Sequence, residues 1–130
     1  YGSAFSILFF DIDKFKSFND EYGHAKGDDV LRGIAEAAKQ CIRETDSVGR
    51  WGGDEFLILL PQTVGAAAQE LAERVMTAVR ALKTPTGIPM TISLSLKTAN
   101  AEDTPQTLLA GADAAMYRAK SLGGNQWVSR

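Results

Sequence analysis

Short apolar runs alternate with polar turns along the chain and predict several strands. Residues 5–12 are apolar and aromatic-rich and end in acidic residues, which is typical of a buried strand. Residues 45–51 and 56–60 are also predicted strands, and they flank a turn that begins Gly52-Gly53. Glycine tolerates the positive φ of a tight turn, so this pair predicts a β-hairpin. Two further strands are predicted over residues 91–97 and 126–128.

Helical periodicity fills the segments between these strands. A short helix is predicted over residues 15–22, then a loop as far as Gly27, with Asp28 as a possible cap of the next helix. A third helix is predicted over residues 65–82, and a fourth begins with Thr104 as cap and Pro105 at its first position. The inward-facing residues of the second and fourth helices recur at helical spacing: Leu31, Ile34, Ala35, Ala38, Cys41 and Ile42, and Leu108, Leu109, Ala112, Ala115, Met116 and Ala119.

The predicted order of elements is β-α-α-β-β-α-β-α-β. Because the central hairpin joins antiparallel strands, we expect a palm-like α+β fold with a mainly antiparallel central sheet flanked by helices. The aromatic residues and one methionine are expected to be core or loop anchors: Phe9, Phe10, Phe15, Phe18, Phe56 and Met116. His24, the single histidine, is expected to pack in the loop rather than act as a catalyst.

Length and composition narrow the class of protein. A chain of 130 residues is expected to form one domain over residues 1–130, and Tyr1 stands almost on a strand, as in a piece cut from a longer chain. The net charge of -2 argues against a DNA- or RNA-binding surface. The single cysteine excludes an internal disulfide, and no apolar run is long enough for a bilayer. We therefore expect a cytoplasmic domain, or the cytoplasmic part of a membrane-anchored protein.

Acidic residues gather at three places where chemistry is possible. These are Asp11-Ile12-Asp13 at the end of the first strand, Asn19-Asp20 with Gly27-Asp28-Asp29, and Asp54-Glu55 at the hairpin tip. If the hairpin lies beside the first strand, Asp11 and Asp54 converge at one edge of the sheet. Paired carboxylates there suit Mg²⁺, which takes oxygen ligands and bridges them to phosphate. The alternative is that these are solvated turn residues, because Asp and Gly are common in turns.

The segment Arg50-Trp51-Gly52-Gly53-Asp54-Glu55-Phe56 contains the full motif after which the GGDEF domain is named. Four further motifs resemble that family in order and spacing: Phe10-Asp-Ile-Asp-Lys-Phe-Lys16, Asn19-Asp20, Gly23-His24 with Gly27-Asp28, and Ala112-Asp-Ala-Ala-Met-Tyr-Arg-Ala-Lys120. By this resemblance the chain is identified as a member of the diguanylate cyclase family. Such enzymes condense two GTP into cyclic di-GMP and release two pyrophosphates.

The resemblance implies a role for each matching position. Asp11 and Asp54, with the Ile12 carbonyl, would ligate Mg²⁺ or Mn²⁺, and Asp54 or Glu55 would help to activate the 3′-hydroxyl group. Asn19 and Asp28 would bind guanine, with Phe15, Gly52 and Gly53 also in the substrate site. Lys16, counted with the catalytic residues, and Lys120 would contact phosphate. The alternatives from the residues alone are that Asn19 and Asp28 are helix caps and that the two lysines are surface charges.

A second site is implied by Arg43-Glu-Thr-Asp46, which stands shortly before Gly52. An Arg-x-x-Asp at this distance resembles the family's product-inhibition site for cyclic di-GMP, with Arg74 as a secondary arginine. The alternative is a simple surface ion pair on a helix, since the two residues are three apart.

Two positions depart from the family pattern. Gly124 stands where an arginine is usual after the last helix, and Ser95 stands where a glycine is usual. The first departure puts GTP binding in question, and the second puts local packing in question.

The function expected from the resemblance is a diguanylate cyclase inhibited by its product. It would act as a homodimer, with an upstream sensor or dimerisation domain. The alternative is a weakly active or inactive domain that serves as a receptor for GTP or cyclic di-GMP.

Overall fold

The computed structural model describes residues 4–129, so the expectation that rests on Tyr1 lies outside the described residues. A five-stranded sheet in the order β2-β3-β1-β4-β5 forms the centre of the molecule. Its strands are β1 (Phe5–Ile12), β2 (Ser47–Arg50), β3 (Glu55–Pro61), β4 (Ile92–Thr98) and β5 (Gln126–Ser129). β5 pairs parallel to β4, and the other neighbours pair antiparallel. The expected α+β fold is therefore confirmed.

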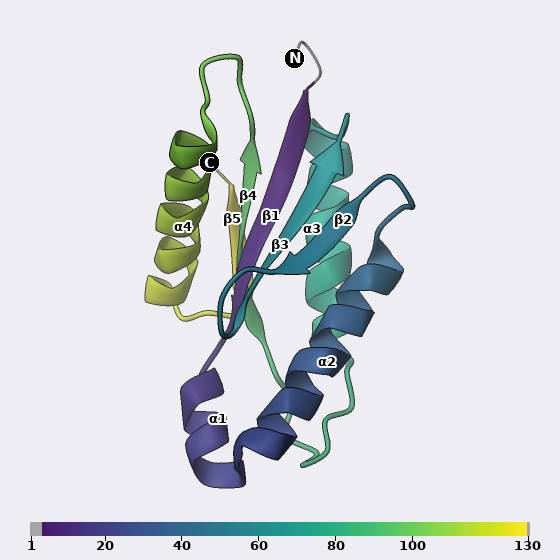
Figure 1. Cartoon of the computed structure of the whole chain (residues 1–130), viewed down its shortest axis with the longest axis vertical. Coiled ribbons are helices and arrows are strands. Elements are labelled where there is room, and N and C mark those ends of the chain that lie inside the picture. Colours follow the sequence, from purple (N-terminus) through teal and green to yellow (C-terminus); the bar gives the residue numbers. More distant parts are fainter. Residues whose placement is uncertain (1–3, 130) are drawn as a thin grey trace.

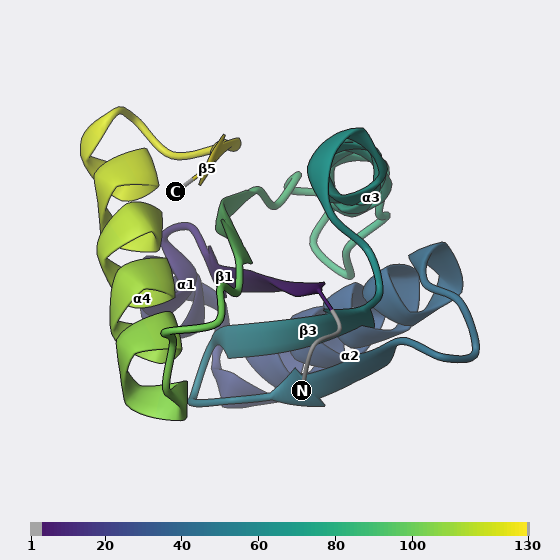
Figure 2. The same ribbon diagram turned by 90° about the horizontal axis from the view of Figure 1, so that it is seen from above.

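The helices form two layers around the sheet (Figure 2). They are α1 (Phe15–Tyr22), α2 (His24–Cys41), α3 (Gly65–Arg80) and α4 (Pro105–Ser121). α2 and α3 cover one face, and α4 covers the other, while α1 follows the end of β1 (Figure 1). No helix in residues 4–129 is both long enough and apolar enough to cross a bilayer.

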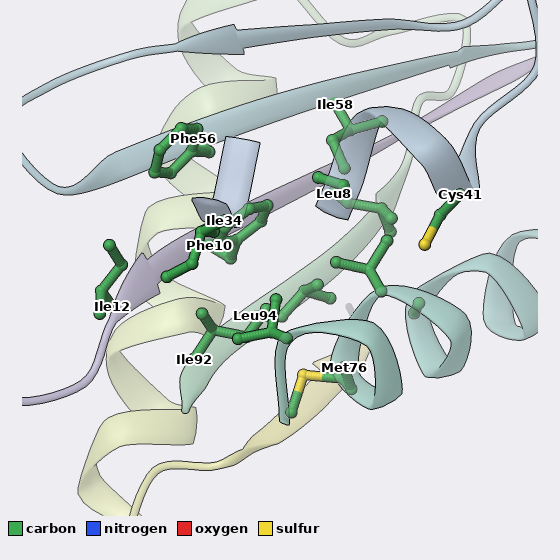
Figure 3. Close-up of a cluster of buried hydrophobic side chains, with 14 of the residues drawn as sticks. Leu8, Phe10, Ile12, Ile34, Cys41, Phe56, Ile58, Met76, Ile92 and Leu94 are labelled. Carbon is green, nitrogen blue, oxygen red and sulfur yellow. The ribbon is translucent and has the colours of Figure 1, made fainter. Parts of the chain in front are cut away.

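The core has two parts because β1, the central strand, is buried on both faces. Leu8, Phe10 and Ile12 point toward α2 and α3, where Figure 3 shows them packed with Ile34 and Met76. The alternate residues Ile7 and Phe9 pack against α4. The residues predicted as core anchors are all buried: Phe9, Phe10, Phe15, Phe18, Phe56 and Met116.

The junction of α1 and α2 differs from the sequence prediction. Gly23, at φ +92°, is the only residue between the two helices, and α2 begins at His24 rather than near Asp28. The predicted loop is therefore wrong, and Asp28 lies within α2 and caps nothing. His24 is exposed in the first turn of α2, so its expected packing role is also wrong. Gly23 makes the single-residue reversal possible because glycine tolerates a positive φ.

Other element ends agree with the sequence prediction to within a few residues. β2 is shorter than predicted, because Asp46 is held in a turn by hydrogen bonds with Arg43. The Thr104 side chain accepts from the Thr107 amide in a capping box, as predicted for the start of α4. Ser95 is accommodated without a packing defect, because its buried hydroxyl donates to the Ala112 carbonyl over 2.7 Å.

Candidate active site at the edge of the sheet

The β2–β3 hairpin brings the acidic turn beside the end of β1 (Figure 1). β3 pairs with β1 so that Glu55 lies opposite Asp11, and the Ile12 amide donates to the Asp54 carbonyl over 3.2 Å. The stacked rings of Phe10 and Phe56 hold this register from the core side, with centroids 5.1 Å apart. The expected convergence of Asp11 and Asp54 at one edge of the sheet is therefore found.

Asp11 lies half-buried at this edge, where its negative charge is poorly solvated. Burial raises its pKa to about 6, the neighbouring Asp54 carboxylate adds to the rise, and Lys120 opposes it. The Lys120 ammonium lies 3.0 Å from Asp11 Oδ1, a buried oxygen for which it is the charged partner. Two close carboxylates in a half-buried position repel one another, and a hard cation between them would relieve that repulsion.

The donor set fits a divalent cation that also uses substrate oxygens. Asp11, Asp54 and the Ile12 carbonyl could hold Mg²⁺, which commonly takes one or two carboxylates and completes its shell with phosphate and water. Within residues 4–129 no three His, Cys, Asp or Glu side chains gather into a preformed metal centre. A metal ion bound here would therefore take its remaining ligands from water or from substrate phosphate.

Glu55 lies in the same acidic environment. Burial raises the pKa of its carboxyl group, and the charges of Asp113 and Asp54 raise it further. Asp113, on α4, was not assigned a role from the sequence. Its position seven residues before Lys120 places both on one helix face, and that spacing could have indicated that it faces the hairpin.

The two glycines of the turn serve a purpose different from the predicted one. Neither Gly52 nor Gly53 has a positive φ, so the prediction of that backbone requirement is wrong. A Cβ at Gly52 would lie 2.6 Å from Glu55 Oε1, whereas a Cβ at Gly53 would have no atom within 4 Å. Gly52 thus admits the Glu55 side chain, and Gly53 leaves open space above the turn.

Arg50 fixes the shape of this turn and was missed in the sequence analysis. Its guanidinium donates to the carbonyl of Gly52 from Nε, and to that of Gly53 from Nε and Nη2 at 3.0 and 2.6 Å. An arginine next to a glycine-rich turn gives little indication of this by sequence alone, because the contact depends on how the turn folds back.

Asp13 is a second missed residue. Burial opposes its ionisation, but hydrogen bonds from Ser93, Thr91 and the Asn125 amide, together with the Lys120 charge, lower the pKa of its carboxyl group. The sequence placed Asp13 in an acidic cluster, but its partners lie far away along the chain.

The predicted guanine contacts lie at the α1–α2 junction. Asn19 is half-buried on α1, and its Oδ1 is buried without a hydrogen-bond partner. A Cβ at Gly27 would lie 1.8 Å from that oxygen, so a larger residue at this position would displace the Asn19 side chain. Asp28 is exposed on α2 next to this point. An unpaired buried acceptor beside an exposed carboxylate could accept the N–H groups of a base.

Three other predicted site residues have contrasting positions. Phe15 is only 8% exposed and belongs to the main core. Lys16, one residue later on α1, is exposed. Lys120, predicted to contact phosphate, is paired with Asp11 and lies 3.5 Å from Asp13 Oδ1.

The second predicted site lies at the other end of β2. Arg43 and Asp46 form an ion pair, with Nη2 3.3 Å from Asp46 Oδ1, and Arg43 also donates to Thr63. This pair lies beyond the end of α2, so the alternative of a pair within a helix is wrong. The Asp46 side chain is fully buried, whereas the Arg43 side chain is 57% exposed. Arg74, on α3, pairs with Glu70 and donates to the Cys41 carbonyl beside this turn.

Comparison with known proteins identifies relatives over nearly the whole chain. The family model described as "Diguanylate cyclase, GGDEF domain" matches residues 1–126. Diguanylate cyclase DgcM of Escherichia coli (strain K12) is 40% identical over 123 residues, which is 94% of this chain and 30% of that protein. This chain thus spans about a third of the length of that curated relative.

Solved structures agree with the sequence relatives. The diguanylate cyclase SiaD from Pseudomonas aeruginosa, in complex with its activator SiaC, superposes with a TM-score of 0.95 at 39% identity, over 99% of this chain and 51% of that one. The GGDEF domain of DgcB from Caulobacter crescentus, in complex with c-di-GMP, superposes with a TM-score of 0.92 at 27% identity, over 98% of this chain and 78% of that one. With the GGDEF turn set beside Asp11 and a family match over residues 1–126, the chain belongs to the GGDEF domain family of diguanylate cyclases.

Proposed function

We propose that this chain is the catalytic domain of a diguanylate cyclase that condenses two GTP into cyclic di-GMP and two pyrophosphates. The observation that carries the proposal is the meeting of Asp11, Asp54 and Lys120 at the sheet edge, where two neighbouring carboxylates, one of them half-buried with a raised pKa, suit a cation. A divalent metal ion bound there would polarise the phosphate oxygens and offset their charge.

The chain's own groups would bind and orient the substrate. Asn19 Oδ1 and the Asp28 carboxylate would accept the guanine N1–H and N2–H₂ groups, and a site built for these donors rejects adenine. Lys120 would leave Asp11 and contact the phosphates while it stays beside Asp13. The open space above Gly53 would admit the triphosphate chain close to the backbone.

The reaction requires two such domains face to face. The 3′-oxygen of one GTP forms a bond to the α-phosphorus of the other, the bond from that phosphorus to the β-phosphate oxygen breaks, and pyrophosphate leaves. Glu55 or Asp54 would accept the 3′-hydroxyl proton. Burial raises the pKa of Glu55, which makes it a better proton acceptor than a solvated carboxylate. Closing the ring repeats the step with the two nucleotides exchanged, so the domain would act as a homodimer.

The turn around Arg43 and Asp46 is proposed to bind the product. The exposed Arg43 guanidinium can contact guanine or phosphate, and the buried Asp46 holds it in place through two side-chain hydrogen bonds. The related GGDEF domain of DgcB was solved with c-di-GMP, which supports binding of this class of ligand.

A weakly active receptor for GTP or cyclic di-GMP is the second candidate. The observation in its favour is Gly124, which has no side chain to reach a phosphate where the family usually has arginine. Turnover by the unmodified domain distinguishes the two functions.

The test uses the chain dimerised by a fused coiled coil and incubated with GTP and Mg²⁺, with cyclic di-GMP measured by chromatography. Asp54→Asn keeps the shape of the side chain and removes its charge, and turnover should fall by about a hundredfold or more. Asp103→Asn is the matched control, because Asp103 is a half-buried carboxylate at the opposite end of α4. Near-normal production by a folded Asp54→Asn dimer would contradict the proposed role, and GTP binding without product from the unmodified dimer would favour the receptor.

A further inference from the structure

The carboxylate of Asp13 joins three segments that are distant in the sequence. Its Oδ1 accepts from the Ser93 hydroxyl over 2.5 Å, and its Oδ2 accepts from the Thr91 hydroxyl over 2.7 Å and from the Asn125 amide over 2.9 Å. The end of β1, the start of β4 and the loop from α4 to β5 therefore meet at one side chain.

This loop is the one that ends the helical turn carrying Lys120. The Gly123 amide donates to the Lys120 carbonyl and the Gly124 amide to the Ala119 carbonyl, both over 3.0 Å. Asn125 is also held from α3, because Arg80 Nε donates to its Oδ1 over 2.8 Å. A carboxylate that holds the Asn125 amide thus restrains the last turn of α4.

Lys120 itself has two carboxylate partners of different character. Its ammonium lies 3.0 Å from Asp11 Oδ1 and 3.5 Å from Asp13 Oδ1. Lys120 is the charged partner of Asp11 Oδ1, whereas three other donors hold the Asp13 carboxylate in place. When a cation engages Asp11, Lys120 loses that partner, and Asp13 is the remaining carboxylate on which it can stay.

We propose that Asp13 is a positioning residue that keeps Lys120, and the loop behind it, at the site when Asp11 binds a metal ion. The part of this inference that involves the metal ion rests on the proposed function. The restraint of the loop by Asp13 does not depend on it. A carboxylate is required because both of its oxygens accept. An asparagine at this position has one acceptor oxygen, and its NH₂ group would face the Asn125 amide or the Lys120 ammonium.

The first test is nuclear magnetic resonance on the isotope-labelled chain, which reads amide exchange at Asn125 and the NH₃⁺ signal of Lys120. In Asp13→Asn the Asn125 amide should exchange about tenfold faster or more where the new NH₂ group faces it, because it has then lost its acceptor, and in the opposite orientation the Lys120 signal should change instead. With saturating Mg²⁺, the Lys120 signal should persist in the unmodified chain and broaden away in the variant. Asp103→Asn is the control, because Asp103 likewise accepts from a backbone amide, that of Asn100, and from a threonine hydroxyl, that of Thr107.

The second test is turnover of GTP by the dimerised variants. Asp13→Asn should lower kcat by about tenfold or more with a smaller change in KM, because Lys120 is displaced while the guanine contacts are kept. Asp103→Asn should lower the melting temperature by a comparable amount and leave kcat unchanged.

Unchanged Asn125 exchange together with an unchanged Lys120 signal in Asp13→Asn, or equal loss of kcat in the control, would overturn the proposal. If Asp13→Asn does not fold, the unmodified chain still tests the proposal. Loss of its Lys120 signal on addition of Mg²⁺ would show that Asp13 does not keep Lys120 at the site, and would overturn the proposal. Failure of the proposed function appears separately, as an unmodified dimer that makes no cyclic di-GMP while the exchange results hold.

Discussion

The Asp11 carboxyl group has its pKa raised from 3.8 to about 6, first by burial and then by Asp54. Between these values the unfolded chain has lost the proton and the folded chain still holds it. The free energy of unfolding therefore falls as pH rises through this window and reaches its lower level above pH 6. A shift of this size corresponds to about 3 kcal/mol. In the free chain the charged Asp11 thus opposes folding.

Asp11→Asn mimics the neutral carboxyl group and should stabilise the free chain by about 1–3 kcal/mol near pH 7.5. The gain should grow between about pH 4 and pH 6 and vanish below that range. Chemical denaturation across pH measures it. Mg²⁺ should stabilise the unmodified chain at neutral pH and leave the variant unchanged. A variant less stable than the unmodified chain at every pH would contradict this account.

Gly124 is restricted by its backbone and by its neighbour. Its φ is +73°, and a Cβ there would lie 2.9 Å from Asp13 Oδ2, an oxygen held in place by two hydrogen bonds. An arginine at this position would strain the backbone and press on Asp13 before it reached a phosphate.

Gly124→Arg and Gly124→Ala should therefore both lower stability, with no gain in GTP affinity for the arginine. Gly87→Ala is the matched control, because Gly87 has φ +77° and a Cβ there would have no atom within 4 Å. Gly87→Ala should lower the free energy of unfolding by about 1–2 kcal/mol, and Gly124→Ala should lower it by about 1 kcal/mol more. Thermal melts of the three variants test this. Equal losses of stability at the two positions would show that the Asp13 side chain can move aside at little energetic cost.

At the scale of elements, α1 and α2 meet where Asn19 lies against Gly27. Alanine in place of a helical glycine usually stabilises a helix by about 1 kcal/mol. At Gly27 the new Cβ would lie 1.8 Å from Asn19 Oδ1, so the Asn19 side chain must move.

Gly27→Ala should therefore weaken binding of a non-hydrolysable GTP analogue by about tenfold, the effect of losing one buried hydrogen bond. Gly33→Ala, also in α2, is the control, because its Cβ would meet the flexible end of Leu82 at 3.1 Å. Calorimetry measures both. An unchanged affinity of Gly27→Ala for the GTP analogue would show that Asn19 does not contact guanine.

At the scale of the whole molecule, β2 separates the two proposed sites. Arg43 and Asp46 precede its first residue, Ser47, and the Gly52-Gly53 turn follows its last residue, Arg50. Removing Asp46 would take away the buried carboxylate that accepts from the Arg43 amide and guanidinium, whereas truncating Arg43 leaves the amide as a donor to Asp46 Oδ2.

Arg43→Ala should weaken cyclic di-GMP binding by about 2 kcal/mol or more and leave the initial rate on GTP largely intact. Arg118→Ala, an exposed arginine on α4, is the control. Calorimetry gives the affinity, and early time points give the rate. Unchanged affinity in Arg43→Ala would refute product binding at this turn.

The order of elements, the mainly antiparallel sheet and the family motifs were all predictable from the sequence. These features depend on neighbouring residues: periods of two and 3.6, helix caps such as Thr104 and turns such as Gly52-Gly53. The meeting of Asp11 and Asp54 was predictable too, because a hairpin beside β1 leaves few registers. The start of α2 was not, because a single glycine, Gly23, can replace a whole loop.

Only the tertiary structure showed how the charges at the site are held. Asp13 binds Thr91, Ser93 and Asn125 across 78, 80 and 112 residues of sequence. The charge of Asp113, on α4, raises the pKa of Glu55 at the hairpin. Such contacts depend on where a helix settles on the sheet and on which side chain reaches across. The hydrophobic pattern decides which face of an element is buried, but the pairing of charges follows from packing between elements distant in sequence.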